Sequence, residues 1–152
     1  MGTTALRLGE AIDELLVVDP AGLADDELAE LTVALQRHTH RLAAVRALCV
    51  AAWDRRRLWA DDGSRSPGHR LAREASMPVA VGKAEVRRAG ALAAMPHTAA
   101  ALSAGELSAQ HVDLLAAAAG GGRGDRFAEH EETLVAHCRV LRFGDARRVV
   151  DY

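Results

Sequence analysis

Aromatic residues are scarce in this 152-residue sequence, which holds two Trp, two Phe and one Tyr. Its core must therefore be built from Ala, Leu and Val. Alanine and leucine favour helices, and alternating runs of β-branched residues bounded by glycine are missing, so the composition predicts an all-α fold. The length fits a single helical domain over residues 1–152.

Cysteine and long apolar runs are equally scarce. Cys49 and Cys138 stand 89 positions apart and form no Cys-x-x-Cys pair, so no disulfide, metal site or cofactor is predicted. No run of 18 apolar residues occurs, which argues against a membrane span. The first apolar stretch, residues 6–18, is interrupted by charges and does not resemble a signal peptide. A cytoplasmic location and no membrane contact are expected.

Charge is distributed unevenly although the net charge is only −2. Residues 1–35 carry one basic and eight acidic residues, residues 36–91 twelve basic and five acidic, and residues 92–152 six basic and eight acidic. A basic middle segment is compatible with binding a polyanion such as DNA. It is equally compatible with packing of the acidic segment against the basic one.

Residues 5–16 are predicted to form a short amphipathic helix, and residues 25–58 a long one with Asp25 as N-cap and three arginines at its end. Apolar residues of the long helix recur in two rows spaced by seven, which is typical of a helix packed lengthwise on a partner helix. The seam residues proposed for self-association are Leu28, Leu31, Leu35, Leu42, Val45 and Cys49. The partner is either another helix of the domain or a second copy. Another helix of the domain is the expected partner, although a length of about 50 Å is long for a domain of this size and makes a homodimer the alternative.

Two short helices are predicted over residues 67–74 and 78–94, each starting at a proline, with Ser66 as the first N-cap. Such a pair, joined by a tight turn and basic on its second helix, is typical of a helix-turn-helix, although ordinary packing helices share the pattern. The candidate DNA-binding residues, expected to contact phosphates without base preference, are Arg65, Arg70, Arg73, Lys83, Arg87 and Arg88. The alternative is a solvated basic face.

The last third of the chain offers no catalytic centre. The glycine-rich residues 120–124 read as a loop, because no strand precedes them and no Gly-Lys-Ser/Thr follows. His130, His137 and Cys138 lack the motif of a zinc enzyme. No catalytic residue is therefore predicted. Because the last predicted helix still runs at Tyr152, residues 1–152 are expected to be the N-terminal part of a longer protein.

The most specific pattern is Ala-Leu-x-x-Gly-Glu-Leu-Ser-x-x-His-Val over residues 101–112, which follows Trp59, Asp62-Gly63, Val86-Arg87 and Met95-Pro96. This order of residues resembles the actinobacterial 13E12 repeat family, in which a domain of unknown function usually precedes an HNH endonuclease domain. The resemblance covers about residues 5–152. It implies a non-catalytic helical accessory module of an HNH-endonuclease-type protein.

The sequence departs from the family pattern at three positions, where Arg70 stands for an expected tryptophan, Gly82 for an alanine and Gly90 for an arginine. Each glycine is predicted to weaken its helix by about 1 kcal/mol relative to alanine. The histidines and metal ligands that an HNH nuclease needs are not supplied by this sequence. Two functions follow: DNA binding through the basic helices, or dimerisation through the long helix without nucleic-acid contact.

Overall fold

The computed structural model describes residues 2–152, and this part of the chain is all-helical, with eight α-helices and no strand. The predicted fold class, with one long helix and several short ones, is confirmed. The chain forms two compact units, Met1–Leu35 (described from residue 2) and Gln36–Tyr152. A single domain over residues 1–152 stays a prediction.

The first unit contains α1 (Gly2–Leu16), the 3₁₀ turn η1 (Pro20–Gly22) and the start of α2 (Asp25–Arg55). Asp19 caps η1, because its carboxylate accepts a hydrogen bond from the Ala21 N–H at 3.0 Å. None of residues 2–35 is buried. The apolar side chains of α1 consequently face solvent.

The long helix α2 differs from its prediction at both ends. Its start is preceded by Ala24, whose N–H donates to the Glu27 carboxylate at 3.2 Å, so Asp25 is the first helical residue and not the N-cap. It ends at Arg55, because Arg57 adopts a left-handed conformation with φ of 53° before the 3₁₀ turn η2 (Leu58–Ala60). The buried residues of α2 are Ala43, Ala44, Ala47 and Val50.

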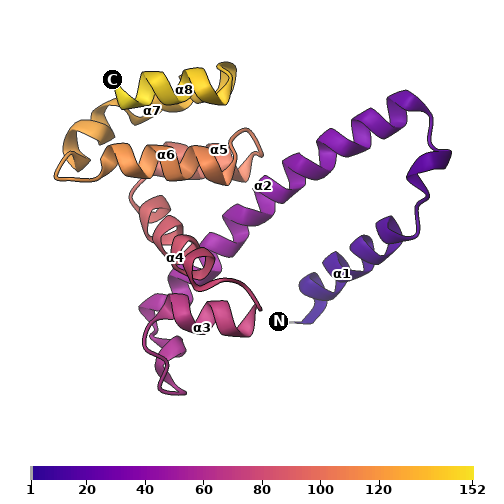
Figure 1. Cartoon of the computed structure of the whole chain (residues 1–152), viewed down its shortest axis with the longest axis horizontal. Coiled ribbons are helices and arrows are strands. Elements are labelled where there is room, and N and C mark those ends of the chain that lie inside the picture. The colour runs from indigo at the N-terminus through magenta and orange to yellow at the C-terminus, as the bar shows by residue number, and fades with distance from the viewer. Residues whose placement is uncertain (1) are drawn as a thin grey trace. The chain divides into compact units, whose positions relative to one another are not determined.

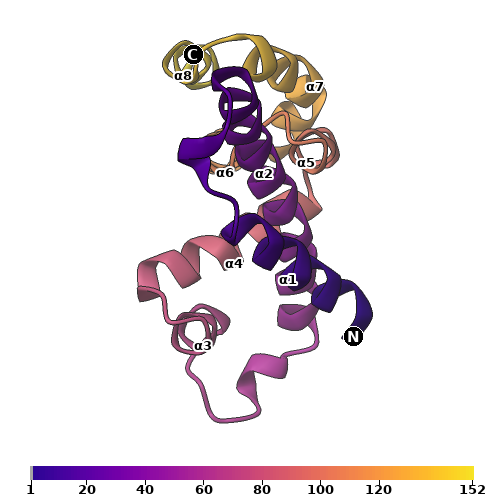
Figure 2. The same ribbon diagram turned by 90° about the vertical axis from the view of Figure 1, so that its right-hand side faces the viewer.

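Six further helices complete the second unit: α3 (Pro67–Glu74), α4 (Val79–Ala93), α5 (Pro96–Ser103), α6 (Ala109–Ala119), α7 (Gly124–Val140) and α8 (Phe143–Asp151). Figures 1 and 2 show α5 to α8 gathered at one end of this unit and α3 at the other, with α4 between them. Pro67 and Pro96 occupy first helical turns, where a missing N–H costs no hydrogen bond.

The core of the second unit consists of two clusters of mostly small aliphatic residues. One joins α2, α4, α5 and α6 through Ala44, Ala47, Val50, Ala89, Leu92, Leu102 and Val112. The other joins the elements from Met95 to α8 through Met95, Ala101, Leu107, Leu115, Phe127, Val135, Cys138 and Ala146. Alanine at the contacts lets the helix axes approach closely. A core with few aromatic side chains therefore goes together with closely packed helices.

A buried carboxylate links α7 to α5. The Glu131 side chain, 2% exposed, accepts hydrogen bonds at Oε1 from the Thr98 N–H at 2.8 Å and from the Thr98 hydroxyl at 2.9 Å. Thr98 is the third residue of α5, so its N–H has no partner within the helix, and a carboxylate at this end also complements the helix dipole. Glu131 therefore caps α5 from another helix.

Candidate nucleic-acid interface

The helices α3 and α4 cross at two buried glycines, Gly68 and Gly82. A Cβ atom on Gly82 would lie 2.4 Å from the Gly68 carbonyl oxygen, and one on Gly68 would lie 2.8 Å from Cγ of Lys83. The two backbones are thus closer than a crossing with side chains would allow. The close crossing requires glycine at position 82, although glycine lowers the helix propensity of α4.

The connection between α3 and α4 is a tight turn, as predicted. Ser76 has a φ of 53°, and the Met77 N–H donates to the Ala72 carbonyl at 2.9 Å in a Schellman arrangement, with serine where glycine is usual. At the other end of α3, the Ser66 hydroxyl accepts from the His69 N–H at 3.3 Å. Local capping therefore builds the helix-turn-helix-like pair.

Two of the candidate arginines, Arg70 and Arg73, hold the loop that precedes α3. Both form ion pairs with Asp62, and Arg70 lies 3.1 Å from it. Hydrogen bonds from Ser64 and Arg73 keep the pKa of Asp62 far below its ordinary value. Both arginines also contact Glu74. Their charge is therefore matched by neighbouring carboxylates.

A third candidate, Arg88, joins α4 to α6. Its guanidinium donates two hydrogen bonds to Asp113, at 2.9 and 2.8 Å, and a third to Glu85 at 3.1 Å. These contacts raise the pKa of Arg88, with the hydrogen bonds to Asp113 as the main cause. Glu85 also accepts from Arg46 of α2 at 3.1 Å. The charge of Arg88 is thus used in holding α4 on α6, which the spacing of residues in the sequence did not reveal.

The remaining candidates, Arg65, Lys83 and Arg87, are exposed and form no hydrogen bond or ion pair with any residue that the structure describes. Lys83 and Arg87 are one turn apart on α4, so their side chains lie on the same side of the helix. The Lys83 stem passes over Gly68, just after Arg65 and the start of α3. The three cations therefore border the α3–α4 crossing.

Further cations near this pair were not singled out by the sequence analysis. Arg55 and Arg56 at the end of α2 are exposed and likewise without a partner in residues 2–152, and the Arg57 guanidinium lies 5.7 Å from the centre of the Trp59 ring. The turn η2 that follows them contacts α3. Their signal in the sequence is the arginine triplet at the end of the long helix, which the helix dipole alone would also explain.

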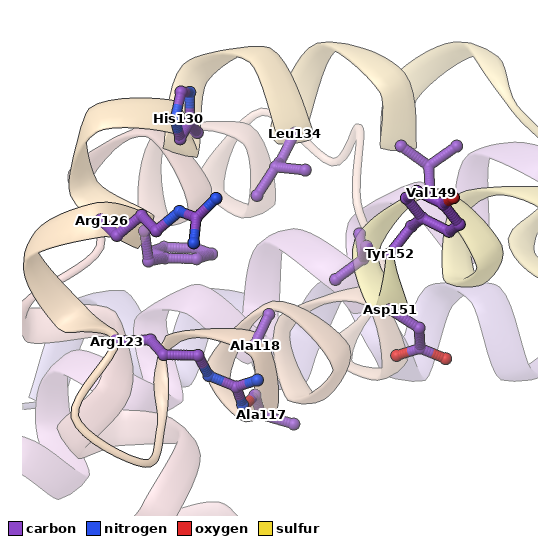
Figure 3. Close-up of a pocket in the computed structure, with 11 residues that line it drawn as sticks. Ala117, Ala118, Arg123, Arg126, His130, Leu134, Val149, Asp151 and Tyr152 are labelled. Carbon is purple, nitrogen blue, oxygen red and sulfur yellow. The ribbon is translucent and has the colours of Figure 1, made fainter.

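A cavity of about 520 Å³ opens between α6, α7 and α8 at the other end of the unit. Figure 3 shows the guanidinium groups of Arg123 and Arg126 on one side and the Asp151 carboxylate on the other. Arg123 already donates to the Gly120 and Ala117 carbonyls, at 3.0 and 3.1 Å, and so closes the end of α6. The lining contains no Ser, Thr or Cys, so it offers no nucleophile of those kinds.

Within residues 2–152, no three His, Cys, Asp or Glu side chains gather where they could hold a metal ion, and His130, His137 and Cys138 form no such group. Cys49 is exposed and Cys138 is buried, and burial raises the pKa of the Cys138 thiol. Over the same residues, no helix combines the length and the apolar character that crossing a bilayer requires.

The motif over residues 101–112 is the connection between α5 and α6. Gly105 has a φ of 78°, and the Glu106 N–H donates to the Ala101 carbonyl at 2.9 Å, which ends α5 in a Schellman arrangement. A Cβ atom on Gly105 would lie 2.4 Å from Cγ of Arg37 on α2. Leu107 is 1% exposed. Each of these motif positions has a structural role in folding.

The model of a family described as Domain of unknown function (DUF222) matches residues 28–147, most of the chain. The chain belongs to the DUF222 family. No curated protein and no solved structure matches it. The matched part of the DUF222 domain includes the α3–α4 pair and the α5–α6 connection.

His111 completes the start of α6 in the DUF222 domain. Its backbone N–H donates to the Ser108 hydroxyl at 3.3 Å, and its Nδ1 accepts from the Ser108 N–H at 3.2 Å, forming a capping box. The ring packs edge-on against Phe143, with 4.9 Å between centroids, and Nε2 is buried without a partner among the described residues. Burial, followed by repulsion from His40, lowers the pKa of His111 below 6.5.

This lowered pKa predicts an acid-dependent loss of stability. As pH falls below 6.5, the unfolded chain binds a proton at His111 before the folded DUF222 domain does, so the free energy of unfolding decreases. The slope contributed by one such proton is at most about 1.4 kcal/mol per pH unit. His111→Gln, which preserves the capping box, is expected to reduce this slope in urea unfolding between pH 7 and 5. An unchanged slope, or an equal reduction in the exposed control His130→Gln, would contradict the prediction.

The seam residues of α2 lie mainly at the surface of the DUF222 domain. Leu28 is 38% and Val45 54% exposed, Leu35 and Cys49 are also exposed, and Leu31 and Leu42 are half-buried. The buried face of α2 instead carries the alanines around residue 44, about 150° away around the helix. The expectation that the seam packs within the domain is therefore wrong at Val45 and Cys49. Its use between two copies stays a proposal.

Proposed function

We propose that this DUF222 domain is a non-catalytic module that binds DNA through the α3–α4 pair. The carrying observation is the set of three exposed cations, Arg65, Lys83 and Arg87, that have no carboxylate partner among residues 2–152. In a helix-turn-helix, the second helix enters the major groove with its N-terminal residues near base edges. Here α4 is the second helix, and two of these cations project from it.

The shape of α4 supports this proposal. Its exposed face also carries Ala80 and Gly90, and nothing lies within 4 Å of a Cβ atom placed on Gly90. These small residues, about one turn before Lys83 and one turn after Arg87, leave room for a phosphate backbone to approach the helix. Arg70, Arg73 and Arg88 are compensated by carboxylates, so we assign Arg70 and Arg73 to holding the loop before α3 and Arg88 to holding α4 on α6. Phosphate contacts then come from the three unpaired cations, Arg65, Lys83 and Arg87.

The resemblance to the 13E12 repeat family extends the proposal to its context. We infer that in the full-length protein this domain serves an HNH endonuclease domain by holding it on DNA, and a cytoplasmic location suits that role. The test is the reading frame after Tyr152. An in-frame HNH motif would support this inference, and its absence from the complete gene would refute it.

Binding is tested by titrating the 152-residue chain into labelled mixed-sequence duplex at several salt concentrations. Three phosphate contacts predict a slope of log affinity against log salt of about −2.7, which is about a 40-fold loss between 50 and 200 mM salt. Lys83→Glu with Arg87→Glu is expected to abolish detectable binding without changing the helical circular dichroism.

The matched control is Arg126→Glu with Arg142→Glu, two exposed cations outside the α3–α4 pair. Both double variants shift the net charge from −2 to −6 by reversing two cations. Binding should persist in the control, because the affinity depends on where the cations lie. Absent or salt-insensitive binding by the unmodified chain, or equal losses in the two variants, would refute DNA binding through α4.

A second candidate function is association of two copies without nucleic-acid contact. One observation favours it, namely that the seam of α2 is exposed on the side away from the core contacts of residues 43–50. The two functions are compatible with each other, since they use different residues, the seam of α2 for association and the unpaired cations Arg65, Lys83 and Arg87 for DNA.

A further inference from the structure

Two helices present exposed apolar faces of matching character. On α1, Leu8 and Ile12 are each 45% exposed, Leu15 is 41% exposed, and no residue of the helix is buried. On α2, the seam residues run from Leu28 to Cys49 and are exposed at Val45 and Cys49. His38 and Ala52 continue the same rows spaced by seven, so the seam as a whole covers residues 28–52. Exposed apolar side chains aligned along helices mark interaction surfaces.

Charges along α2 select the direction in which a second copy would pair with it. The helix starts with Asp25, Asp26 and Glu27 and ends with Arg55, with Arg56 directly after it. A parallel pair would place acids beside acids and arginines beside arginines. An antiparallel pair places the acidic start of each helix beside the basic end of the other and opposes the two helix dipoles. The charges therefore favour an antiparallel pair of α2 helices.

The area of the seam shows that α1 is also needed. The 25 helical residues of the seam, 28–52, span about 38 Å, and a contact strip about 10 Å wide covers roughly 380 Å² in projection. Stable interfaces bury about 800 Å² on each partner. The 15 residues of α1 offer a second strip of roughly 220 Å². The α2 strip alone is less than half of a stable interface, so the exposed face of α1 is expected to contribute.

We propose that two copies of this chain associate through the exposed faces of α1 and α2, with their α2 helices antiparallel. This inference rests on the association hypothesis and is independent of DNA binding. Full overlap of the seam, residues 28–52, pairs Leu28 with Ala52 and Leu31 with Cys49 of the second copy. Val45 then meets Leu35, and Leu42 meets His38, so apolar side chains meet in three of these four pairs.

The native Cys49 gives a direct test of orientation. In the antiparallel pair, Leu31→Cys places a new thiol opposite Cys49 of the second copy, and mild oxidation should give a covalent dimer in most of the protein. The two positions are 18 residues apart, about 27 Å along one helix, so they cannot join within one chain. Unmodified chain should stay monomeric after oxidation on a denaturing gel, because the two Cys49 thiols are also about 27 Å apart.

Two controls separate orientation from association. Leu31→Cys with Cys49→Ala should lose the crosslink, and Cys138 is too buried to replace Cys49. A Cys49–Cys49 crosslink in the unmodified chain would indicate a parallel pair and overturn the orientation while association survives. A dimer that Leu31→Cys fails to crosslink would refute the proposed seam.

Association itself is measured by light scattering of the unmodified chain under reducing conditions. Twice the chain mass of 16.2 kDa is expected at micromolar concentration. Leu8→Asp with Ile12→Asp should shift the species to monomer, while Arg7→Asp with Glu10→Lys, on the same exposed helix, should leave the dimer intact. A monomer at high micromolar concentration would refute both association and orientation. A dimer that survives the α1 substitutions would refute the role of α1 in the interface.

Discussion

Glu131→Ala is expected to lower the free energy of unfolding by about 3 kcal/mol, the largest single effect that this structure predicts. The substitution removes two hydrogen bonds to a charged acceptor, leaves the Thr98 N–H and hydroxyl buried without a partner, and opens a void between α5 and α7. Urea unfolding followed by circular dichroism measures this change directly.

Two comparison variants show whether the buried hydrogen bonds are the cause. Glu132→Ala removes the neighbouring carboxylate, which is exposed, and should change stability by less than about 0.5 kcal/mol. Glu131→Gln keeps an acceptor oxygen but loses the charge, so a loss of about 1 kcal/mol is expected. Equal effects of Glu131→Ala and Glu132→Ala would contradict a buried cap.

Gly82→Ala is expected to destabilise the second unit by about 2 to 3 kcal/mol, even though alanine is the better helix former. The added methyl group would lie 2.4 Å from the Gly68 carbonyl oxygen and 3.1 Å from Cβ of Ala72, and a backbone carbonyl cannot rotate away. The helices α3 and α4 must therefore separate. Overpacking of this kind exceeds the gain of about 1 kcal/mol in helix propensity.

Gly90→Ala is the matched control, because Gly90 lies in the interior of the same helix with nothing near its missing side chain. It should gain about 1 kcal/mol of stability through helix propensity alone. Chemical unfolding of the two variants should therefore give shifts of opposite sign. Stabilisation by both substitutions would show that the α3–α4 crossing is not as close as described.

Helix content and helix starts could be predicted from the sequence because they depend on local chemistry. The scarcity of aromatic residues together with abundant alanine and leucine indicated helices, and Ser66 with Pro67 marked the start of α3 through capping and a fixed φ angle. The start of α8 carries no such signal, because its N-cap, Arg142, makes no side-chain capping hydrogen bond and Asp145 already lies within the first turn.

The buried face of α2 was misassigned for a physical reason. A search for periodic hydrophobicity follows leucine and valine, and these residues lie on the seam, whereas the core contacts are made by alanines. Alanine contributes little hydrophobicity but permits close helix approach. A hydropathy pattern therefore hardly identifies a helix face whose core contacts are made by alanines.

For the candidate site, the sequence indicated which cations share a helix face but not which of them are paired with carboxylates. Lys83 and Arg87 could be placed on one helix face from their spacing alone. The pairing of Arg88 with Asp113, 25 positions away, depends on how α4 packs on α6. Glu131 and Thr98, 33 positions apart, form a partnership of the same long-range kind. Such contacts follow from tertiary structure, which local sequence patterns do not encode.

Both tryptophans of the chain lie at the corner where α2 gives way to α3. The Trp59 indole N–H donates to Asp54 at 2.9 Å, and the Trp59 carbonyl accepts from Arg70 at 3.4 Å, while Trp53 is half-buried nearby on α2. Intrinsic fluorescence excited at the red edge of indole absorption therefore originates beside the α3–α4 pair. An unlabelled chain carries its own optical reporter for ligands that reach this corner, and that reporter is insensitive to events confined to α7 and α8.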